Sequence, residues 1–286
     1  MNISIFRVAP GTDLKLSHES TDEAGQYKSE EEAEISMQDN IDNMIKLQDK
    51  LYAEGSHALL IIFQGMDAAG KDSAIKHVMS GLNPQATMVH SFKSPSVEEM
   101  NHDYLWRYSK YLPGRGQIGI FNRSYYEEVL IARVHNLVVN QKIPQEFINP
   151  EIWQTRLRHI VNFEEYLYMN GITVIKFFLH ISKDEQRRRL LKRIDDPNKN
   201  WKYSEDDLLE RDYWNDYNKC YQEAIMGTSL KSAPWYLVPS DKKWFARLVI
   251  SEVIVQTLNS MKLKYPELDK KQFLKLESNR IKLLQD

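Results

Sequence analysis

Gly65-Met66-Asp67-Ala68-Ala69-Gly70-Lys71-Asp72-Ser73 follows directly on the apolar run His57–Gln64. The stretch has the Gly-x-x-x-x-Gly-Lys spacing of a P-loop, in which two glycines let successive backbone N–H groups face a phosphate. Lys71 adds a mobile positive charge, and the helix expected next presents its positive N-terminus. An ordinary strand-to-helix turn would need neither Lys71 nor two spaced glycines. We therefore expect the phosphate to be bound by Gly65, Ala68, Ala69, Gly70, Lys71, Asp72 and Ser73.

The loop departs from the usual pattern at the position after the lysine. A Ser or Thr normally binds magnesium there, and this chain has Asp72. Ser73 lies one residue further on, about 100° away around a helix. Asp67 inside the loop would repel a phosphate unless Mg²⁺ lay between them. We therefore expect Mg²⁺ as the cofactor and Asp67 as its ligand.

Four more short apolar runs follow the first one. They are Ala86–Phe92, Gln117–Asn122, Ile172–Ile181 and Trp235–Pro239. Continuous apolarity is typical of strands buried on both faces of a parallel sheet, and helical patterns separate the runs. The sequence predicts a parallel five-stranded sheet in a three-layer α/β sandwich, with its ligand at the carboxyl ends of the strands.

Polar residues stand at the carboxyl end of the run Gln117–Asn122. Asn122 and Arg123 come first, and Arg123 has an evident partner in a phosphate on the P-loop. Glu127 belongs either to the site or to a solvated first helical turn, where acids are favoured in any case.

A basic run follows the fourth strand. Ser182 and Glu185 have the spacing of a capping box, and the helix that they would begin carries many cations. These are Arg187, Arg188, Arg189, Lys192 and Arg193. A charge run is usually a solvated helix face. Its position beyond a strand end, where P-loop kinases have a lid, favours phosphate binding by Arg188, Arg189 and Arg193.

A second glycine-rich loop, Gly114–Gly119, matches the dinucleotide pattern Gly-x-Gly-x-x-Gly. It precedes a strand and does not join a strand to a helix, so it fails the context test for a Rossmann site. Arg115 on this loop is better interpreted as a candidate phosphate contact.

Composition excludes several classes of protein. The formal net charge of the 286 residues is −2, which argues against a cationic nucleic-acid binder. Cys220 is the only cysteine, so no intrachain disulfide can form and a reducing, cytoplasmic setting is expected. The sequence has no apolar stretch of about 18 residues and no recognisable secretion signal, so we expect no membrane association.

The chain divides into three parts on composition. Residues 1–34 are expected to be an N-terminal extension, loose over the acidic stretch 13–34, although Ser29 and Glu32 have the spacing of a helix cap. Residues 35–262 would form the P-loop domain, with a lid at about 182–225. Residues 263–286 are expected to form a charged helical tail.

Together these segments resemble the family-2 polyphosphate kinases from about Ala58 to Leu248. Besides the P-loop, the matching pieces are Phe92-Lys93-Ser94-Pro95-Ser96, His102-Asp103-Tyr104-Leu105-Trp106-Arg107, Pro113-Gly114-Arg115-Gly116, Asn122-Arg123-Ser124-Tyr125-Tyr126-Glu127, Glu185-Gln186-Arg187-Arg188-Arg189, Asp196-Pro197-Asn198-Lys199-Asn200-Trp201-Lys202 and Ala233-Pro234-Trp235. Several long matches in order are far more specific than a P-loop alone.

The resemblance implies a thymidylate-kinase-like core with a helical lid. It also implies Mg²⁺-dependent, reversible transfer from inorganic polyphosphate to an adenine nucleotide, and a dimer or larger homo-oligomer. The family's P-loop aspartate and lysine fall on Asp67 and Lys71, and its lid arginines on Arg188, Arg189 and Arg193. Lys93 lies in a matching piece and is expected at the phosphates.

Many members of the family have Asp-Arg-Ser where this chain has Asn122-Arg123-Ser124. The chain resembles the subgroup that accepts both AMP and ADP. Two alternatives remain at this stage. An ATP-dependent nucleoside monophosphate kinase would share the loop, lid and fold, and a non-catalytic phosphate- or nucleic-acid-binding regulator could keep the loop. The intact Lys71 and the basic lid argue against the regulator.

Overall fold

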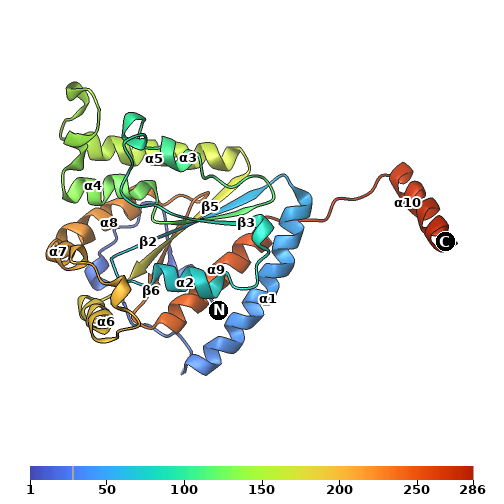
Figure 1. Cartoon of the computed structure of the whole chain (residues 1–286), viewed down its shortest axis with the longest axis horizontal. Helices are drawn as coiled ribbons and strands as arrows, with labels where there is room; N and C mark the ends of the chain where they lie inside the picture. Colours follow the sequence, from blue (N-terminus) through green and yellow to red (C-terminus); the bar gives the residue numbers. More distant parts are fainter. Residues whose placement is uncertain (28, 286) are drawn as a thin grey trace.

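The computed structural model describes residues 1–27 and 29–285 of the chain; Lys28 and Asp286, which belong to the predicted extension and tail, lie outside the described residues. Its centre is one sheet in the order β1-β6-β5-β2-β4-β3 (Figure 1). The five parallel strands are β2 (Ala58–Gly65), β3 (Thr87–Ser91), β4 (Ile118–Asn122), β5 (Ile172–His180) and β6 (Trp235–Pro239). The predicted α/β fold and its five parallel strands are confirmed.

Helices cover both faces of this sheet. On one face lie α1 (Glu30–Glu54), α2 (Lys71–Val78) and α9 (Lys243–Ser260), and on the other α5 (Ile152–Met169) and α8 (Trp214–Thr228). The remaining helices are the short α3 (Trp106–Ser109) and α4 (Ile131–Val134), then α6 (Lys183–Asp195), α7 (Asp206–Asp212) and α10 (Lys270–Leu283). No helix among the described residues is long and apolar enough to cross a membrane.

The helix signals in the sequence have the expected effect. Ser29 caps α1 by accepting from the Glu32 N–H, and Gly55 ends it with φ 63°. Ser182 caps α6 in the same way through the Glu185 N–H. These bonds satisfy N–H groups that a helix leaves without intrahelical partners.

Burial across the sheet follows the strand order. All eight residues of β2 are buried, because β2 is central and covered on both faces. The expectation of two buried faces is wrong for β3, where Met88 and Val89 are exposed. β3 is the edge strand and pairs only with β4.

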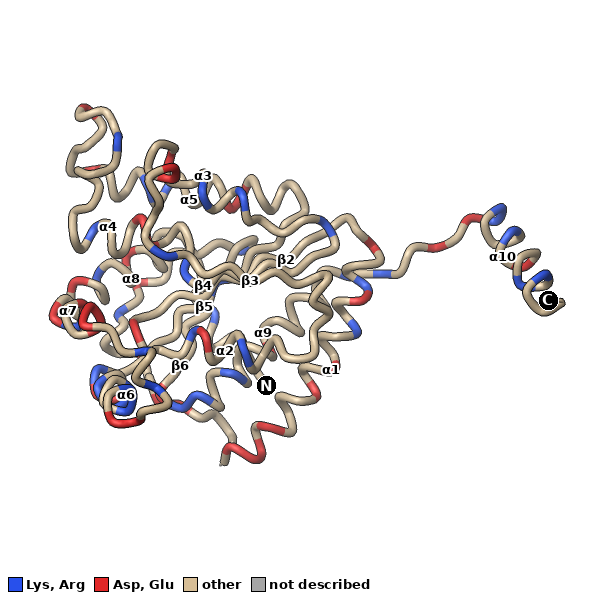
Figure 2. The backbone as a smooth tube through the Cα atoms, in the orientation of Figure 1, with Lys and Arg blue, Asp and Glu red and all other residues tan. Residues whose placement is uncertain are grey.

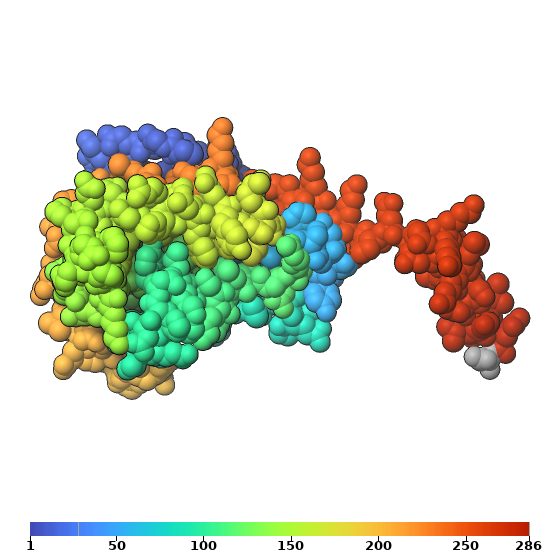
Figure 3. All heavy atoms as spheres, turned by 90° about the horizontal axis from the view of Figure 1, so that it is seen from above, coloured from blue at the N-terminus to red at the C-terminus, as the bar shows by residue number. Residues whose placement is uncertain are grey.

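Residues 13–34 were expected to be loose, but the N-terminal segment packs against the core. A sixth strand, β1 (Arg7–Val8), pairs antiparallel with β6, and Leu14 and Leu16 are buried. A two-residue strand is too short to show periodicity. Isolated apolar residues among polar ones give no pattern from which packing against the core could be predicted. By contrast, α10 stands clear of the body (Figure 3), and none of its described residues is buried.

Replacing Leu16 with Ala tests whether the N-terminal segment belongs to the folded core. We expect the free energy of unfolding to fall by about 2–4 kcal/mol, because a buried leucine loses transfer energy and leaves a cavity. Leu274→Ala in α10, where the side chain is 62% exposed, is the matched control and should change stability by less than about 0.5 kcal/mol. Urea denaturation followed by circular dichroism measures both. Equal effects of the two substitutions would contradict the packing of this segment.

Candidate active site

The P-loop connects the end of β2 to α2 and forces the backbone through unusual conformations. Gly65 has φ 152°, and a Cβ there would lie 2.9 Å from the Leu179 carbonyl oxygen of β5. Gly70, at the N-terminus of α2, has φ 111°. Only glycine fits at position 65. Its presence there lets the loop turn directly over the sheet and present its N–H groups.

Lys71 is buried at the start of α2, and its ammonium lies over the loop. Nζ donates to the carbonyl oxygens of Gly65, at 2.6 Å, and Met66, at 3.2 Å. Burial lowers the pKa of Lys71, with Arg123 adding to the effect and Asp67 opposing it. A phosphate bound in the loop would therefore compete with these two carbonyl oxygens for hydrogen bonds from the Lys71 ammonium.

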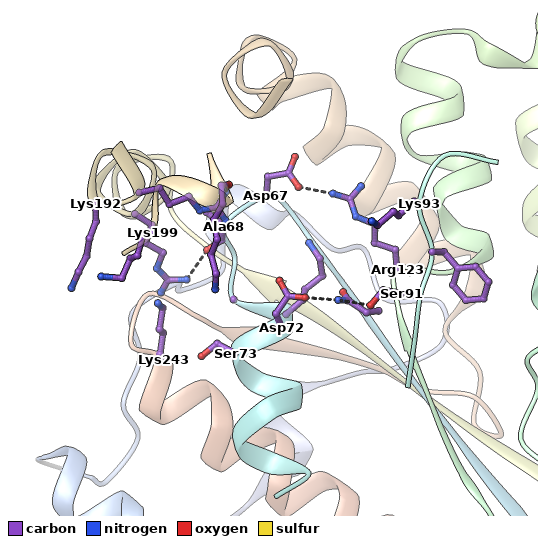
Figure 4. A pocket seen from close by; sticks show the side chains of 17 residues that line it. Asp67, Ala68, Asp72, Ser73, Ser91, Lys93, Arg123, Lys192, Lys199 and Lys243 are labelled. Atoms are coloured by element: carbon purple, nitrogen blue, oxygen red, sulfur yellow. Dashed lines mark hydrogen bonds and ion pairs between the residues drawn. The ribbon is translucent and has the colours of Figure 1, made fainter. Parts of the chain in front are cut away.

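Arg123 follows β4 in a left-handed conformation, with φ 63°. Its guanidinium donates to Asp67 Oδ1 at 2.6 Å (Figure 4) and to Glu127 Oε2 at 3.4 Å. Glu127 also accepts from Gln64 Nε2 at 2.9 Å. Glu127 first, and then Asp67, raise the pKa of Arg123, so the arginine stays charged. Glu127 thus faces the site and not open solvent.

Asn122 is the last residue of β4, and its amide links the P-loop to the sheet. Nδ2 donates to Asp72 Oδ1 at 2.7 Å and to Ser91 Oγ at 3.3 Å. Its carbonyl oxygen, Oδ1, is buried and has no hydrogen-bond partner among the described residues. This oxygen is consequently free to accept from a ligand or to bind a cation.

A cavity of about 520 Å³ opens in front of these residues (Figure 4). P-loop residues form one wall, with Asn122 and Arg123 beside them. The remaining lining is strongly cationic, and its members are Lys93, Arg189, Lys192, Arg193, Lys199, Lys202 and Lys243. Figure 2 shows a concentration of Lys and Arg at α6, and three of its residues, Arg189, Lys192 and Arg193, line this cavity. The arrangement suits a chain of phosphates.

A second cavity, of about 560 Å³, adjoins the first and shares Phe92, Lys93 and Arg123 with it. Its wall includes the aromatic Tyr108 and the apolar Ile131 and Leu137, beside polar groups such as Arg107, Glu128 and Gln141. Two cavities therefore meet at a wall that contains two cations.

The predicted lid arginines differ in their environment. Arg189 is 6% exposed and clamps the loop, donating to the carbonyl oxygens of Ala68 and Ala69 at 2.9 and 2.8 Å and of Ser240 at 2.5 Å. Arg188 is 66% exposed, pairs with Glu185 and does not line the cavity. In this structure Arg188 lies outside the cavity, and its contact with phosphate stays a prediction. Successive helical residues point about 100° apart, and the inner face belongs to Arg189, Lys192 and Arg193.

Arg115 lies at the wrong end of the sheet for a phosphate contact. It precedes β4, whereas the P-loop lies at the carboxyl ends of the strands, and its guanidinium donates to the Ser56 carbonyl at 2.5 Å. The structure therefore corrects the expectation that Arg115 contacts a phosphate on the P-loop. Ser73 does line the cavity, and its hydroxyl accepts from Arg247 at 2.9 Å.

Lys199, Lys202 and Lys243 were missed as site residues. The first two stand in one of the family-like segments, and Lys243 follows β6 at the carboxyl edge of the sheet. That edge was already the expected ligand position, so the placement of Lys243 after a strand was a usable signal. Burial lowers the pKa of Lys243 to about 8, with Arg189 and Arg247 adding to the effect.

Comparison with known proteins gives consistent matches. Residues 27–266 match the family model described as polyphosphate kinase 2 (PPK2). The chain is 49% identical to an ADP-polyphosphate phosphotransferase of Rhodopseudomonas palustris, over 92% of this chain and 91% of that protein. It is 42% identical to an AMP/ADP-polyphosphate phosphotransferase of Meiothermus ruber, over 92% of this chain and 95% of that protein. The crystal structure of polyphosphate kinase 2 from Arthrobacter aurescens TC1 superposes with a TM-score of 0.89 at 36% identity, over 99% of this chain and 96% of that one.

Replacing Lys192 and Lys199 together with Ala tests whether the cation-lined cavity binds a phosphate chain. We expect the affinity for tripolyphosphate to fall about tenfold or more, and its dependence on salt to weaken, because fewer counterions are released on binding. Isothermal titration calorimetry at two salt concentrations measures both quantities. Arg188→Ala is the matched control and should leave the affinity within about twofold, as expected for an exposed charge. An equal loss in the control would show that general electrostatic attraction, and not the lining of the cavity, sets the affinity. No loss in the double variant would return the basic run to a solvated helix face.

We expect Lys243 to make the affinity of the cavity for tripolyphosphate depend on pH. Since its pKa is about 8, the side chain is charged at pH 7 and largely neutral at pH 9. Tripolyphosphate affinity should therefore weaken as the pH rises through 8, beyond any change from titration of the ligand itself. In Lys243→Met, affinity at pH 7 should fall and the part of the pH dependence due to Lys243 should disappear. Identical pH profiles of the two proteins would show that Lys243 does not face the ligand.

Proposed function

The chain belongs to the polyphosphate kinase 2 family, and we propose that it transfers the terminal phosphoryl group of inorganic polyphosphate to AMP and to ADP, reversibly. The single observation that carries this proposal is the lining of the P-loop cavity. Eight Lys and Arg side chains from outside the loop line this cavity, and Phe92 is the one aromatic ring among the lining residues described. A long polyanion needs many cations along its path.

The same observation distinguishes polyphosphate from ATP as the donor. An ATP-dependent nucleoside monophosphate kinase must hold a second base and ribose, and such sites are mostly apolar. The cavity at the P-loop offers little apolar wall of this kind, whereas the adjoining cavity with Tyr108, Ile131 and Leu137 does. We therefore place polyphosphate at the P-loop and the acceptor nucleotide in the adjoining cavity.

The chemistry asks little of the protein beyond alignment and charge. One phosphoanhydride is broken while another forms, so the groups need only be held in line and their charge neutralised. Lys71 would hold the donor phosphates at the loop. Arg123 and Lys93 stand in the wall that both cavities share, where the phosphoryl group would pass. No residue is required as a covalent nucleophile.

The oxygen ligands at the site fit Mg²⁺, which prefers carboxylate and carbonyl oxygens. Asp67 lines the cavity, and so does Asn122 with its unpartnered, buried Oδ1. When bound, the metal would neutralise charge on the phosphates. Among the described residues no three His, Cys, Asp or Glu side chains group into a metal site, so substrate oxygens would complete the coordination.

The acceptor range is the finer part of the proposal. The two relatives described above differ in it, since one is named for ADP and the other for AMP and ADP. Asn122 is neutral and donates to Asp72, so the loop carboxylate is held by an amide and not by a second acid. Metal position then depends more on the substrates' own phosphates, which favours tolerance of acceptors that differ by one phosphate.

We also propose the domain bounds, the cellular compartment and the oligomeric state of the enzyme. We infer a P-loop domain over residues 35–262, to whose sheet the N-terminal segment adds β1, with α6, α7 and the first turns of α8 in a lid at about 182–225 and a tail from residue 263. The single cysteine favours a reducing cytoplasm, and the family resemblance favours a homo-oligomer.

Polyphosphate as the only donor is the test. Incubated with AMP, Mg²⁺ and polyphosphate, the protein should form ADP first and ATP afterwards, resolved over time by ion-exchange chromatography. Lys71→Ala is the control and should lose at least about 100-fold in rate, as on removal of a transition-state charge contact. Product from ADP but none from AMP would restrict the acceptor to diphosphates. No product from either nucleotide would reject the proposed function.

A further inference from the structure

Five polar side chains lie wholly inside the protein, behind the strand end that carries Arg123. They are Tyr125 and Tyr126 from the 3-10 turn after β4, Glu164 from α5, Lys176 from β5 and Thr228 from the last turn of α8. Each is 0% exposed. We refer to these five residues as the buried network.

Their contacts form one connected set. Lys176 pairs with Glu164 and donates to the Thr228 carbonyl at 2.8 Å. The hydroxyls of Tyr125 and Tyr126 each donate to Glu164 Oε1 at 2.9 Å. The Tyr126 hydroxyl also lies 2.8 Å from Thr228 Oγ1, which accepts from Trp235 Nε1 at 2.9 Å. Both charges therefore have several partners without any access to water.

Stability alone does not account for such a pair. Removing two charges from water is costly, and an apolar pair of the same volume is often as stable. Burial raises the pKa of Glu164 and lowers the pKa of Lys176, and each of the two side chains opposes that change in the other. A fully satisfied polar network supplies something different, which is a single arrangement of the elements that it joins.

The elements that it joins are those that present the site. Tyr125 and Tyr126 lie between Arg123 and Glu127, and Arg123 has a left-handed backbone that is unfavourable for an arginine. Such a conformation persists only where its surroundings determine it. On one side the Arg123 N–H donates to the Phe63 carbonyl at 3.0 Å. On the other side the chain is held through the two tyrosine hydroxyls.

We propose that the buried network is a positioning device, which fixes Arg123 and Glu127 by holding Tyr125 and Tyr126 and which ties that segment to the helix returning from the lid. That helix, α8, follows α6 and α7 and ends at Thr228. The five residues do not line either cavity, so they act through Arg123 and Glu127 and not on the substrates. The inference rests on the role proposed for Arg123.

The double variant Tyr125→Phe/Tyr126→Phe removes both hydroxyls and keeps both rings. We expect kcat for transfer from polyphosphate to ADP to fall about tenfold or more, since small misplacements of a charge contact are costly. The KM values for both substrates should stay within about twofold, because an interaction made mainly in the transition state is lost. Hydrogen exchange of the backbone N–H groups of residues 123–129 should become faster.

Tyr236→Phe is the matched control, because Tyr236 is a buried tyrosine outside the network. It should change neither kcat nor exchange at residues 123–129. If the double variant does not fold, Tyr125→Phe alone should give a smaller loss of the same kind, confined to kcat. A kcat no lower than that of the control, or unchanged exchange at these residues, would overturn the inference. Absence of transfer by the wild-type protein would reject the proposed function instead, and the exchange rates would still decide whether the network holds the segment.

Discussion

β2 pairs in parallel with both β4 and β5, and this pairing determines where the charged groups of the site lie. Phe63 is opposite Asn122 in β4, and Gly65 is opposite Leu179 in β5. The P-loop must therefore begin against the backbone of β5, where no side chain larger than glycine fits. The same register places Arg123 directly beside Asp67. A strand shifted by one residue would turn its side chains to the other face and separate these groups.

The site also has to hold many cations close together before any phosphate arrives. The protein manages this by giving the inner cations fixed partners. Lys71 and Arg189 donate to backbone carbonyls of the loop, and Arg123 has two carboxylates. Carbonyls satisfy a donor without cancelling its charge, although Arg189 also pairs with Glu185. Nine Lys and Arg side chains against Asp67 and Asp72 leave the lining of the cavity cationic, while the whole chain has a net charge of −2. Arg189 therefore stabilises the conformation of the P-loop and also adds a positive charge to the lining of the cavity.

Sequence reasoning was most successful where a pattern is local. The P-loop, the five parallel strands and the caps at Ser29 and Ser182 depend on residues near one another in the chain, and all were predicted. The sequence could not show that Arg188 lies outside the cavity and Arg189 inside it, because the side of α6 that faces the loop is set by tertiary packing. The error at Arg115 was avoidable. A loop that precedes a parallel strand lies at its amino end, opposite the expected ligand.

The two cavities and the buried network together suggest why Arg123 tolerates an unfavourable backbone. In the arrangement that we propose, donor and acceptor phosphates carry like charges and would approach across the wall that contains Arg123 and Lys93. A cation in that wall is useful only if it stays there while both ligands exchange. Anchoring the residues after Arg123 to Glu164, in the core, makes its position independent of which substrate is bound. Transfer in both directions, as proposed, would need this independence, because donor and acceptor would exchange roles while the wall between them stays the same.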